Sequence, residues 1–253
     1  MLKEILNRIQ LLEPARDVRN AARLGRKRLA WTWKRRFGQV DSRLVRAHLD
    51  NSAQGKLHLG AGNHILKGWL NADLYPASAD VLHLDARMPF PFPDNTFAFV
   101  FSEHMIEHLS YHDGVNMLVE CLRVLSPGGR IRISTPDFNF LLNIYRDPTS
   151  SLHQDYIAWQ LEWINRNDMA TAPSIEPIFV VNNFVRDWGH EFIYDPAVLH
   201  LALESAGFVN LTACAMNESE LPELSALENE GRAPSGFIAL ETMTLEGTKP
   251  ARR

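Results

Sequence analysis

The segment FSEHMIEHL at residues 101–109 gathers side chains that can do chemistry, because His104, Glu107 and His108 stand in the order H-x-x-E-H. Two imidazoles and a carboxylate in this order can hold a zinc ion for peptide hydrolysis when both histidines project from one face of a continuous helix. Here the motif directly follows an apolar run typical of a strand, and a separate capped helix comes after it. We therefore expect a turn at the end of a strand and no metal site, which leaves a zinc peptidase as a remote alternative.

A glycine bend followed by two acidic residues forms a second candidate site. Gly60 and Gly62 come directly after an apolar run, where two glycines allow a tight turn and a close approach of the backbone to a ligand. Asp73 and Asp85 end the next two runs, so parallel strands would bring both carboxylates to the same edge of a sheet. Asp73 could accept hydrogen bonds from both ribose hydroxyls of a nucleoside, and Asp85 could reach an adenine amino group.

A dinucleotide fits this group poorly. The pattern G-x-G-x-x-G would require glycine at Ile65, and an acidic residue about 20 positions further on. Asp73 instead follows Gly60 by 13 positions, and the chain has no Gly-Lys-Ser/Thr cradle for a nucleotide triphosphate. A smaller nucleoside ligand without a pyrophosphate makes fewer demands on the loop.

The elements that must position these residues alternate between strands and helices, which indicates an α/β sheet. A capping box at Ser110 and Asp113 begins one helix, which ends at the Pro-Gly-Gly stop 127–129, and a second helix at 197–206 closes with Gly207. Seven runs read as strands: 56–59, 69–74, 81–84, 97–101, 130–134, 208–215 and 237–245.

Residues 138–194 interrupt this regularity with eleven aromatic residues and no clear strand period. An insertion that follows a sheet strand would lie above its carboxyl end, where open α/β sheets bind their ligands. Two interpretations remain open. The insertion is either a lid that forms the acceptor site or a helical cap whose aromatic residues only pack together.

The net charge of −4 conceals an asymmetry, because residues 1–50 hold 13 Lys and Arg against 5 Asp and Glu. We predict a basic helical arm at 1–52 and one domain at 53–250. The arm could dock on its own acidic domain, bind a partner protein or lie on an anionic membrane. Nucleic acid is not an expected partner, because the domain has no second basic surface.

Several features favour a cytoplasmic protein, with peripheral attachment to the inner face of a membrane as an option through the arm. The first ten residues carry charges and lack the apolar centre of a signal peptide, and no run approaches the roughly 20 apolar residues that span a bilayer. Cys121 and Cys214 are isolated from each other in apolar stretches, which fits free thiols in a reducing compartment.

Four separated segments, LHLGAGN, WLNADL, DARMPFPFPDNTFAFVFSEHMIEHL and LRVLSPGGRIRISTPD, together resemble the class I S-adenosylmethionine-dependent methyltransferases, particularly the methyltransferase type 11 group. A bacterial branch of predicted methyltransferases, often found with surface-polysaccharide functions, also has a basic arm and stretches like GHEFIYD and ESELPELSALE. The resemblance covers about residues 56–245. It implies a Rossmann-like sheet of seven strands, six parallel and the last antiparallel, with helices on both faces.

The resemblance also implies S-adenosyl-L-methionine as the cofactor. The glycine bend would border its methionine part, Asp73 its ribose, and Asp85 with Ala86 its adenine. Ser102 and Glu103 would lie near the sulfonium. The complete set of implied cofactor residues is Gly60, Ala61, Gly62, Asp73, Leu74, Asp85, Ala86, Ser102 and Glu103.

Three features depart from the family pattern. Most members carry an acidic residue two positions before the first glycine, where this chain has His58, and His64 occupies the position of the third glycine of the loop. The helix that usually joins the first two strands must be nearly absent, because only residues 63–68 remain for it. The amino-acid end of the cofactor is therefore the least well explained.

The implied function is transfer of a methyl group to a small-molecule or saccharide acceptor, with a role in surface-polysaccharide biosynthesis suggested by the resemblance alone. Methyl transfer is an in-line displacement, so the protein must align the donor with the nucleophile, exclude water and, for a hydroxyl acceptor, remove a proton. His104 is the preferred candidate base and His190 the second, with Glu103 and Glu191 as further candidates. The alternative is a non-catalytic scaffold or binding protein with a cofactor fold.

Overall fold

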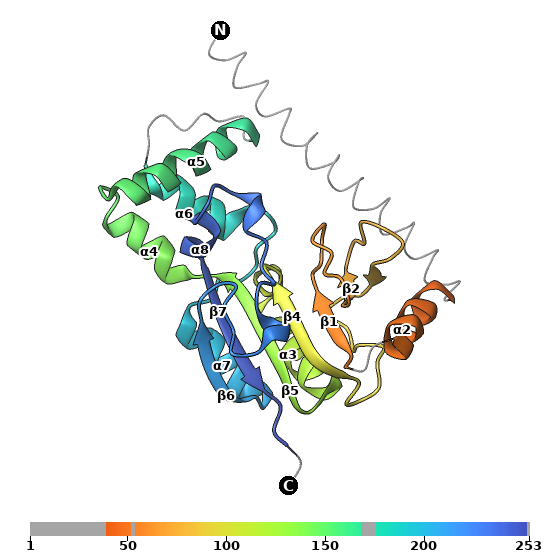
Figure 1. The fold of residues 1–253 in the computed structure, drawn as a ribbon. Coiled ribbons are helices and arrows are strands. Elements are labelled where there is room, and N and C mark those ends of the chain that lie inside the picture. The colour runs from red at the N-terminus through yellow and green to blue at the C-terminus, as the bar shows by residue number, and fades with distance from the viewer. Residues whose placement is uncertain (1–38, 52–53, 168–175, 252–253) are drawn as a thin grey trace.

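The structure, a computed structural model, describes residues 39–51, 54–167 and 176–251, and the statements below concern these residues. A seven-stranded sheet forms the centre of the molecule, with the strand order β3-β2-β1-β4-β5-β7-β6 (Figure 1). β7 runs antiparallel to both of its neighbours, and the other pairs are parallel. The predicted fold class is therefore confirmed. The strands are β1 (Lys56–Leu59), β2 (Leu70–Asp73), β3 (Leu82–His83), β4 (Phe97–Glu103), β5 (Leu125–Pro136), β6 (Val209–Cys214) and β7 (Thr242–Thr248).

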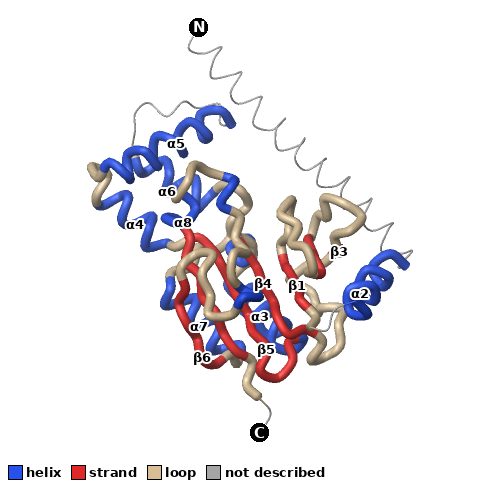
Figure 2. The backbone as a smooth tube through the Cα atoms, viewed as in Figure 1, coloured by secondary structure: helices blue, strands red, loops and turns tan. Residues whose placement is uncertain are grey.

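Some helices gather above one end of the sheet, and others lie against one of its faces or at its edge (Figure 2). The two predicted helices are present, since Ser110 caps one by accepting a hydrogen bond from the Asp113 backbone N–H at 3.2 Å, and Gly207 ends the other with φ 104°. The helices are α2 (Gln39–Asn51), α3 (Tyr111–Val124), α4 (Phe138–Arg146), α5 (Ser151–Asn167), α6 (Pro177–Arg186), α7 (Pro196–Ala206) and α8 (Phe237–Glu241), with the 3-10 turns η1 (Ile106–His108), η2 (Pro222–Leu224) and η3 (Glu230–Arg232).

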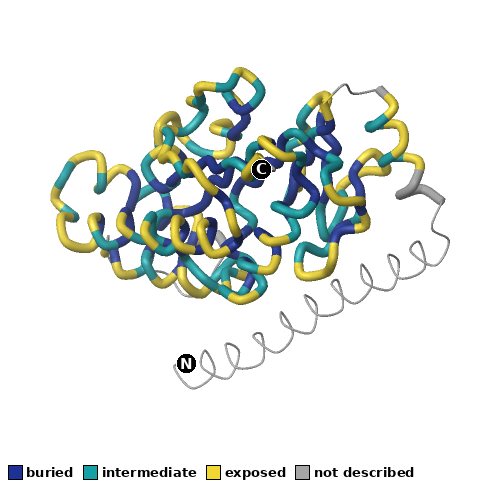
Figure 3. Tube along the Cα trace, turned by 90° about the horizontal axis from the view of Figure 1, so that it is seen from below, coloured by how far each residue is buried: buried dark blue, intermediate teal, exposed yellow. Residues whose placement is uncertain are grey.

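The two faces of the sheet are covered differently. On one face, apolar strand residues pack against α2, α3 and α7 in the main core. The opposite face is covered by the segment 215–234, where Leu224 and Leu227 pack on Trp69, Phe99 and Phe101. The expectation of helices on both faces is met on one face by α-helices, whereas the other face, in the described part of the chain, carries only short 3-10 turns. Figure 3 shows buried residues gathered along the strands in the middle of the molecule.

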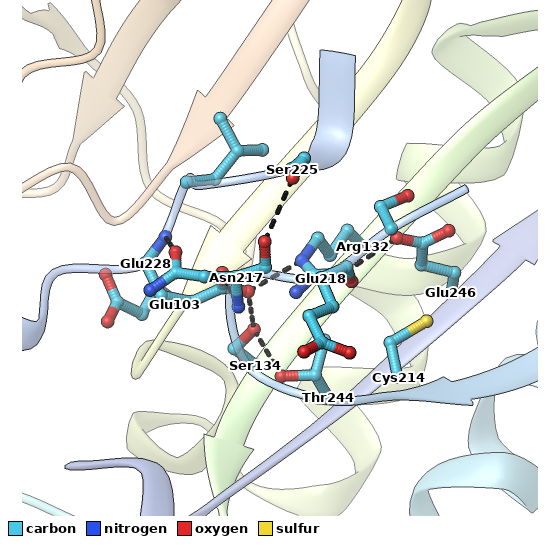
Figure 4. A network of polar contacts seen from close by, with 12 residues as sticks. Glu103, Arg132, Ser134, Cys214, Asn217, Glu218, Ser225, Glu228, Thr244 and Glu246 are labelled. Atoms are coloured by element: carbon cyan, nitrogen blue, oxygen red, sulfur yellow. Dashed lines mark hydrogen bonds and ion pairs between the residues drawn. The ribbon is translucent and has the colours of Figure 1, made fainter. Parts of the chain in front are cut away.

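Polar side chains also occupy the face beneath the segment 215–234 (Figure 4). The buried Arg132 guanidinium on β5 lies 2.6 Å from Glu228 of that segment and 2.7 Å from Glu246 of β7. Ser134 donates a hydrogen bond to the same Glu228 carboxylate at 2.6 Å. These charge-assisted contacts tie the covering segment to the strands that border the site.

The described part of the insertion 138–194 is mostly helical and has its own apolar cluster, built by α4, α5 and α6. Phe237 and Leu240 of α8 pack against this cluster, so the prediction of a strand at 237–245 is wrong for its first half. The apolar run FIALE is compatible with either a strand or a short helix. Gly236, in the left-handed conformation with φ 85°, directs the chain toward the helices of the insertion, where the run forms α8. The strand begins only at Thr242.

Most of the predicted basic arm, residues 1–38, lies outside the described residues. Its last part forms α2, which contacts β2 and β3 at the edge of the sheet. Among the described residues, none of the helices combines the length and the apolar character needed to cross a membrane.

Candidate functional site

The glycine bend and Asp73 meet at the carboxyl edge of the sheet, because β1 and β2 are parallel neighbours. Gly60 and Gly62 adopt φ values of 71° and 50°, in the left-handed region that glycine adopts without a steric penalty. The Gly62 backbone N–H donates to Asp73 Oδ2 at 2.8 Å, and the Tyr75 N–H donates to Oδ1 at 2.6 Å. Each carboxylate oxygen is thereby held in place and keeps a lone pair for a ligand.

A cavity of about 440 Å³ opens beside this pair. Its wall includes Asp85, whose carboxylate receives two hydrogen bonds from the Arg87 side chain at 2.9 and 3.0 Å. These bonds lower the pKa of Asp85 although partial burial raises it, so the group is ionised at neutral pH. Of the nine residues expected to bind a cofactor, six line this cavity: Gly60, Gly62, Asp73, Leu74, Asp85 and Ala86.

The other three expected residues, Ala61, Ser102 and Glu103, do not line the cavity. Ala61 is buried, and the buried Ser102 hydroxyl has no hydrogen-bond partner among the described residues. The Glu103 carboxylate turns to the covering segment, where it accepts the Asn229 backbone N–H at 3.1 Å and lies 3.3 Å from Arg232. Glu103 therefore anchors the wall of the site.

The two unusual histidines of the glycine loop also contact the protein. His58 is buried, lies 2.9 Å from Asn71 Oδ1 and stacks on Phe101, and burial lowers its pKa to about 4. His64 lies 2.9 Å from the Leu227 carbonyl oxygen. A neutral imidazole thus stands where the sequence resemblance led us to expect an acid, and the loop is connected to the segment 215–234.

A second cavity of about 300 Å³ adjoins the first and is closed on one side by the helical insertion. Aromatic residues of α5 and α6 form much of its wall, and Arg232 and Glu241 add charged groups. Three side chains, His104, His108 and Trp188, line both cavities. A group at this boundary can therefore face two ligands at once.

His104 lies at the boundary in a strained conformation, with φ 44° directly after the end of β4. Its Nε2 lies 2.8 Å from Thr242 Oγ1, and its Nδ1 lies 3.4 Å from Glu107 Oε1. Burial lowers the pKa of His104 well below its ordinary value, so the ring is neutral. Because β4 and η1 are separate elements, His104 and His108 do not share a continuous helix, as the sequence predicted.

His190 faces the second cavity from the loop after α6. Its Nδ1 lies 2.6 Å from the Phe184 carbonyl oxygen, which can only accept a hydrogen bond, so Nδ1 carries the proton and Nε2 is the basic atom. Burial lowers the pKa of His190 to about 4. Its ring centroid lies 4.8 Å from that of His108.

Sequence reasoning missed several residues that shape the two cavities. Arg87, Met105, Trp188, Arg232 and Glu241 all line one or both of them. Arg87 has a local signal, since it stands two positions after Asp85. The others come from loops and from α8, whose positions depend on packing between distant parts of the chain.

Residues 64–133 match the family model described as a methyltransferase domain, and no curated protein sequence matches the chain. Among the solved structures that the chain resembles is an S-adenosylmethionine-dependent methyltransferase from Thermotoga maritima, described as a possible histamine N-methyltransferase, with 17% identity over 88% of this chain and 97% of that chain and a TM-score of 0.44. A methyltransferase from Archaeoglobus fulgidus has 17% identity over 83% of this chain and 93% of that chain, with a TM-score of 0.46. A methyltransferase from Mesorhizobium loti has 14% identity over 83% of this chain and 98% of that chain, with a TM-score of 0.44.

Proposed function

We propose that this chain, whose residues 64–133 match the model of a methyltransferase domain, is a class I S-adenosylmethionine-dependent methyltransferase that transfers a methyl group from S-adenosylmethionine to a small-molecule or saccharide acceptor. The observation that carries the proposal is the pair of adjoining cavities with a common boundary at His104, His108 and Trp188. Donor and acceptor must meet in line for methyl transfer, and two cavities in contact provide that arrangement.

The larger cavity suits the cofactor. Its glycine bend leaves the backbone open, since a β-carbon added at Gly62 would meet no atom within 4 Å, whereas one at Gly60 would collide with Met105. The fixed oxygens of Asp73 would accept the ribose hydroxyls, and Asp85 would receive the adenine amino group. When bound, S-adenosylmethionine supplies an electrophilic methyl group on its sulfonium.

The smaller cavity suits an acceptor with flat apolar faces and several polar groups. The indoles of Trp159, Trp163 and Trp188 offer surfaces on which a sugar ring or an aromatic ring could pack. Arg232 and the buried Glu241, which also line this cavity, would provide hydrogen bonds. These features support a saccharide acceptor and are equally compatible with another small polar molecule.

Proton removal from a hydroxyl acceptor would fall to a neutral histidine at the boundary. His190 has a free Nε2, whereas both ring nitrogens of His104 already face protein atoms. We therefore assign the base role to His190 and a positioning role to His104, which reverses the order of preference reached from the sequence. Closure of the cavity by Trp188 would exclude water from the transfer step.

Calorimetry with S-adenosylmethionine and S-adenosylhomocysteine tests the proposal, and Asp73→Asn is the informative variant. We expect the wild type to bind both ligands and Asp73→Asn to bind about 10- to 100-fold more weakly, because a charged hydrogen-bond acceptor is lost. Asp80→Asn, an exposed carboxylate outside both cavities, is the matched control. Transfer of a labelled methyl group to a panel of saccharides would then identify the acceptor.

The second candidate is a non-catalytic binding protein that keeps the fold. It is favoured by His58 and His64, which bind protein atoms in a loop where relatives contact the cofactor. Absence of heat with either ligand at millimolar concentration would support this second function and exclude the first.

A further inference from the structure

We propose that Glu107, His108 and His190 form a binding site for a divalent transition-metal ion, with zinc as the representative, in the smaller cavity. The three residues each offer one ligand atom, and these atoms lie within 4.8 Å of one another. All three line the cavity. That the cavity receives the acceptor rests on the proposed function, whereas the site itself rests on the geometry alone.

The three groups come from two distant parts of the chain. Glu107 and His108 belong to η1, and His190 follows α6. Two backbone hydrogen bonds bring the segments together, because the N–H groups of Glu191 and Phe192 donate to the Glu107 carbonyl oxygen at 2.8 and 3.1 Å. The fold itself therefore holds the third group beside the first two.

Hydrogen bonds to neighbouring residues leave one ligand atom available on each of two of the side chains. The hydrogen bond from His190 Nδ1 to the Phe184 carbonyl leaves Nε2 as the free atom, which is the second-shell arrangement that metal-bound histidines usually have. Thr135 donates to Glu107 Oε2 at 3.0 Å in a similar way, so that Oε1 is left for another partner.

A second feature that points to a bound cation is the unpaired oxygen atom Glu107 Oε1. Glu107 is fully buried, and its Oε1 has no hydrogen-bond partner among the described residues. The nearest candidate is His104 Nδ1, but 3.4 Å is long for a hydrogen bond. An unpaired buried carboxylate oxygen is costly, and a bound cation would remove that cost.

The charges around the cluster permit a cation. Arg232 lies in the same cavity, but its guanidinium is 3.3 Å from Glu103, and Glu241 adds a second carboxyl group to the wall. Two imidazoles with one carboxylate favour zinc and similar transition ions over magnesium or calcium, which prefer oxygen ligands. Three protein ligands also leave a coordination position open.

An ion here would explain why the H-x-x-E-H motif lies at the boundary between the two cavities although it does not form the continuous helix of a zinc peptidase. With zinc bound, His190 Nε2 would hold the ion and could not also act as the base. The ion would instead lower the pKa of a hydroxyl group that binds it, so the site would favour an oxygen acceptor over a carbon acceptor. No metal was expected from the sequence, because His104 and His108 could share an ion only on a continuous helix. The structure brings in His190 instead.

The test uses the full-length protein after treatment with a chelator. Zinc chloride is titrated by calorimetry, and cobalt(II) absorption reports the ligand type. We expect one zinc ion per wild-type chain, and at least ~10-fold weaker binding in Glu107→Gln, His108→Ala and His190→Ala, with a changed cobalt spectrum. His200→Ala, an exposed histidine on α7, is the matched control and should bind zinc as the wild type does.

Two outcomes would overturn the proposal: no stoichiometric zinc binding by the wild type, or equal loss in His200→Ala and His190→Ala. S-adenosylhomocysteine binding, measured on the same samples, keeps the two proposals apart. If the nucleoside binds and zinc does not, only the metal site fails. If zinc binds and the nucleoside does not, the proposed function fails. Glu107→Gln retains the shape of the side chain, so normal circular dichroism in this variant excludes misfolding as the cause of lost binding.

Discussion

The Glu241 carboxyl group lies inside the smaller cavity, where burial raises its pKa to about 7. Tyr156 donates a hydrogen bond to it, and Gln160 donates to the Tyr156 oxygen at 3.0 Å, so a chain of polar groups runs into the cap. Because Tyr156 and Gln160 belong to α5, the protonation state of Glu241 affects the stability of the helices of the insertion.

We predict that Glu241→Gln stabilises the protein increasingly as the pH rises from about 5 to about 7. The folded wild type retains the proton up to about pH 7, whereas the unfolded chain loses it near pH 4.5, so unfolding releases a proton between these values and the wild type loses stability. The shift corresponds to about 3 kcal/mol at pH 8. Glutamine does not titrate and retains an acceptor for Tyr156.

Urea unfolding of both proteins at pH 5, 6, 7 and 8 measures this effect as a difference in unfolding free energy. The exposed Glu204→Gln on α7 is the matched control, for which we expect a difference that does not change with pH. A constant difference between Glu241→Gln and the wild type across this range would contradict a raised pKa at Glu241.

At the scale of elements, the bend after β1 depends on a close approach between Gly60 and Met105. A β-carbon at Gly60 would lie 2.5 Å from Met105 Cγ, whereas one at Gly62 would meet nothing within 4 Å. Both positions are left-handed, so alanine at either should cost about 1–2 kcal/mol. Only Gly60→Ala adds a clash, which we expect to cost about 1–3 kcal/mol more.

A double-mutant cycle with Met105→Gly tests this difference by urea unfolding, because Met105 Cβ would also lie only 2.6 Å from the added β-carbon. If the clash is real, Met105→Gly should reduce the cost of Gly60→Ala and leave that of Gly62→Ala unchanged. Equal costs for the two glycine variants would show that Met105 moves aside freely.

Most of the strands and helices, but not all of them, could be predicted from the sequence. Strands and capped helices were found because buried strands form short apolar runs and because Ser110 and Gly207 carry local signals. The run FIALE at 237–241 was misassigned because its apolar character arises from packing on the cap, which no local pattern encodes. The uneven covering of the sheet was also beyond prediction, since it depends on the path of the segment 215–234.

The candidate site could likewise be predicted only in part from the sequence. Gly60, Gly62, Asp73 and Asp85 could be grouped from sequence because the carboxyl ends of parallel strands share one edge. The direction of Glu103 could not, because it is set by Arg232, which lies 129 positions later in the chain. His190 was found as a candidate base, but its distance from Glu107 and His108 follows only from the folded chain.

At the scale of the whole molecule, one buried arginine connects the sheet to the segment that walls the site. Arg132 is fully buried, contacts Glu228 and Glu246, and donates to the Glu218 carbonyl oxygen at 2.8 Å. Glu228 also accepts the Asn217 backbone N–H at 2.9 Å. The network therefore stabilises a segment that has no long helix of its own and that carries Arg232 to the smaller cavity.

We predict that Arg132→Met lowers the unfolding free energy by about 3–5 kcal/mol, because it leaves Glu228 buried without a cationic partner and leaves Glu246 with Arg130 alone. Methionine fills a similar volume, so lost packing contributes little. Adding Glu228→Gln should recover part of the stability, since the unpaired buried carboxylate is then removed. Urea unfolding measures these changes, and hydrogen exchange of residues 217–229 shows whether the segment loosens before the rest. The exposed Arg46→Met on α2 is the control and should change stability by less than about 0.5 kcal/mol. If Arg132→Met costs no more than this control, packing of Leu224 and Leu227 alone holds the wall of the site.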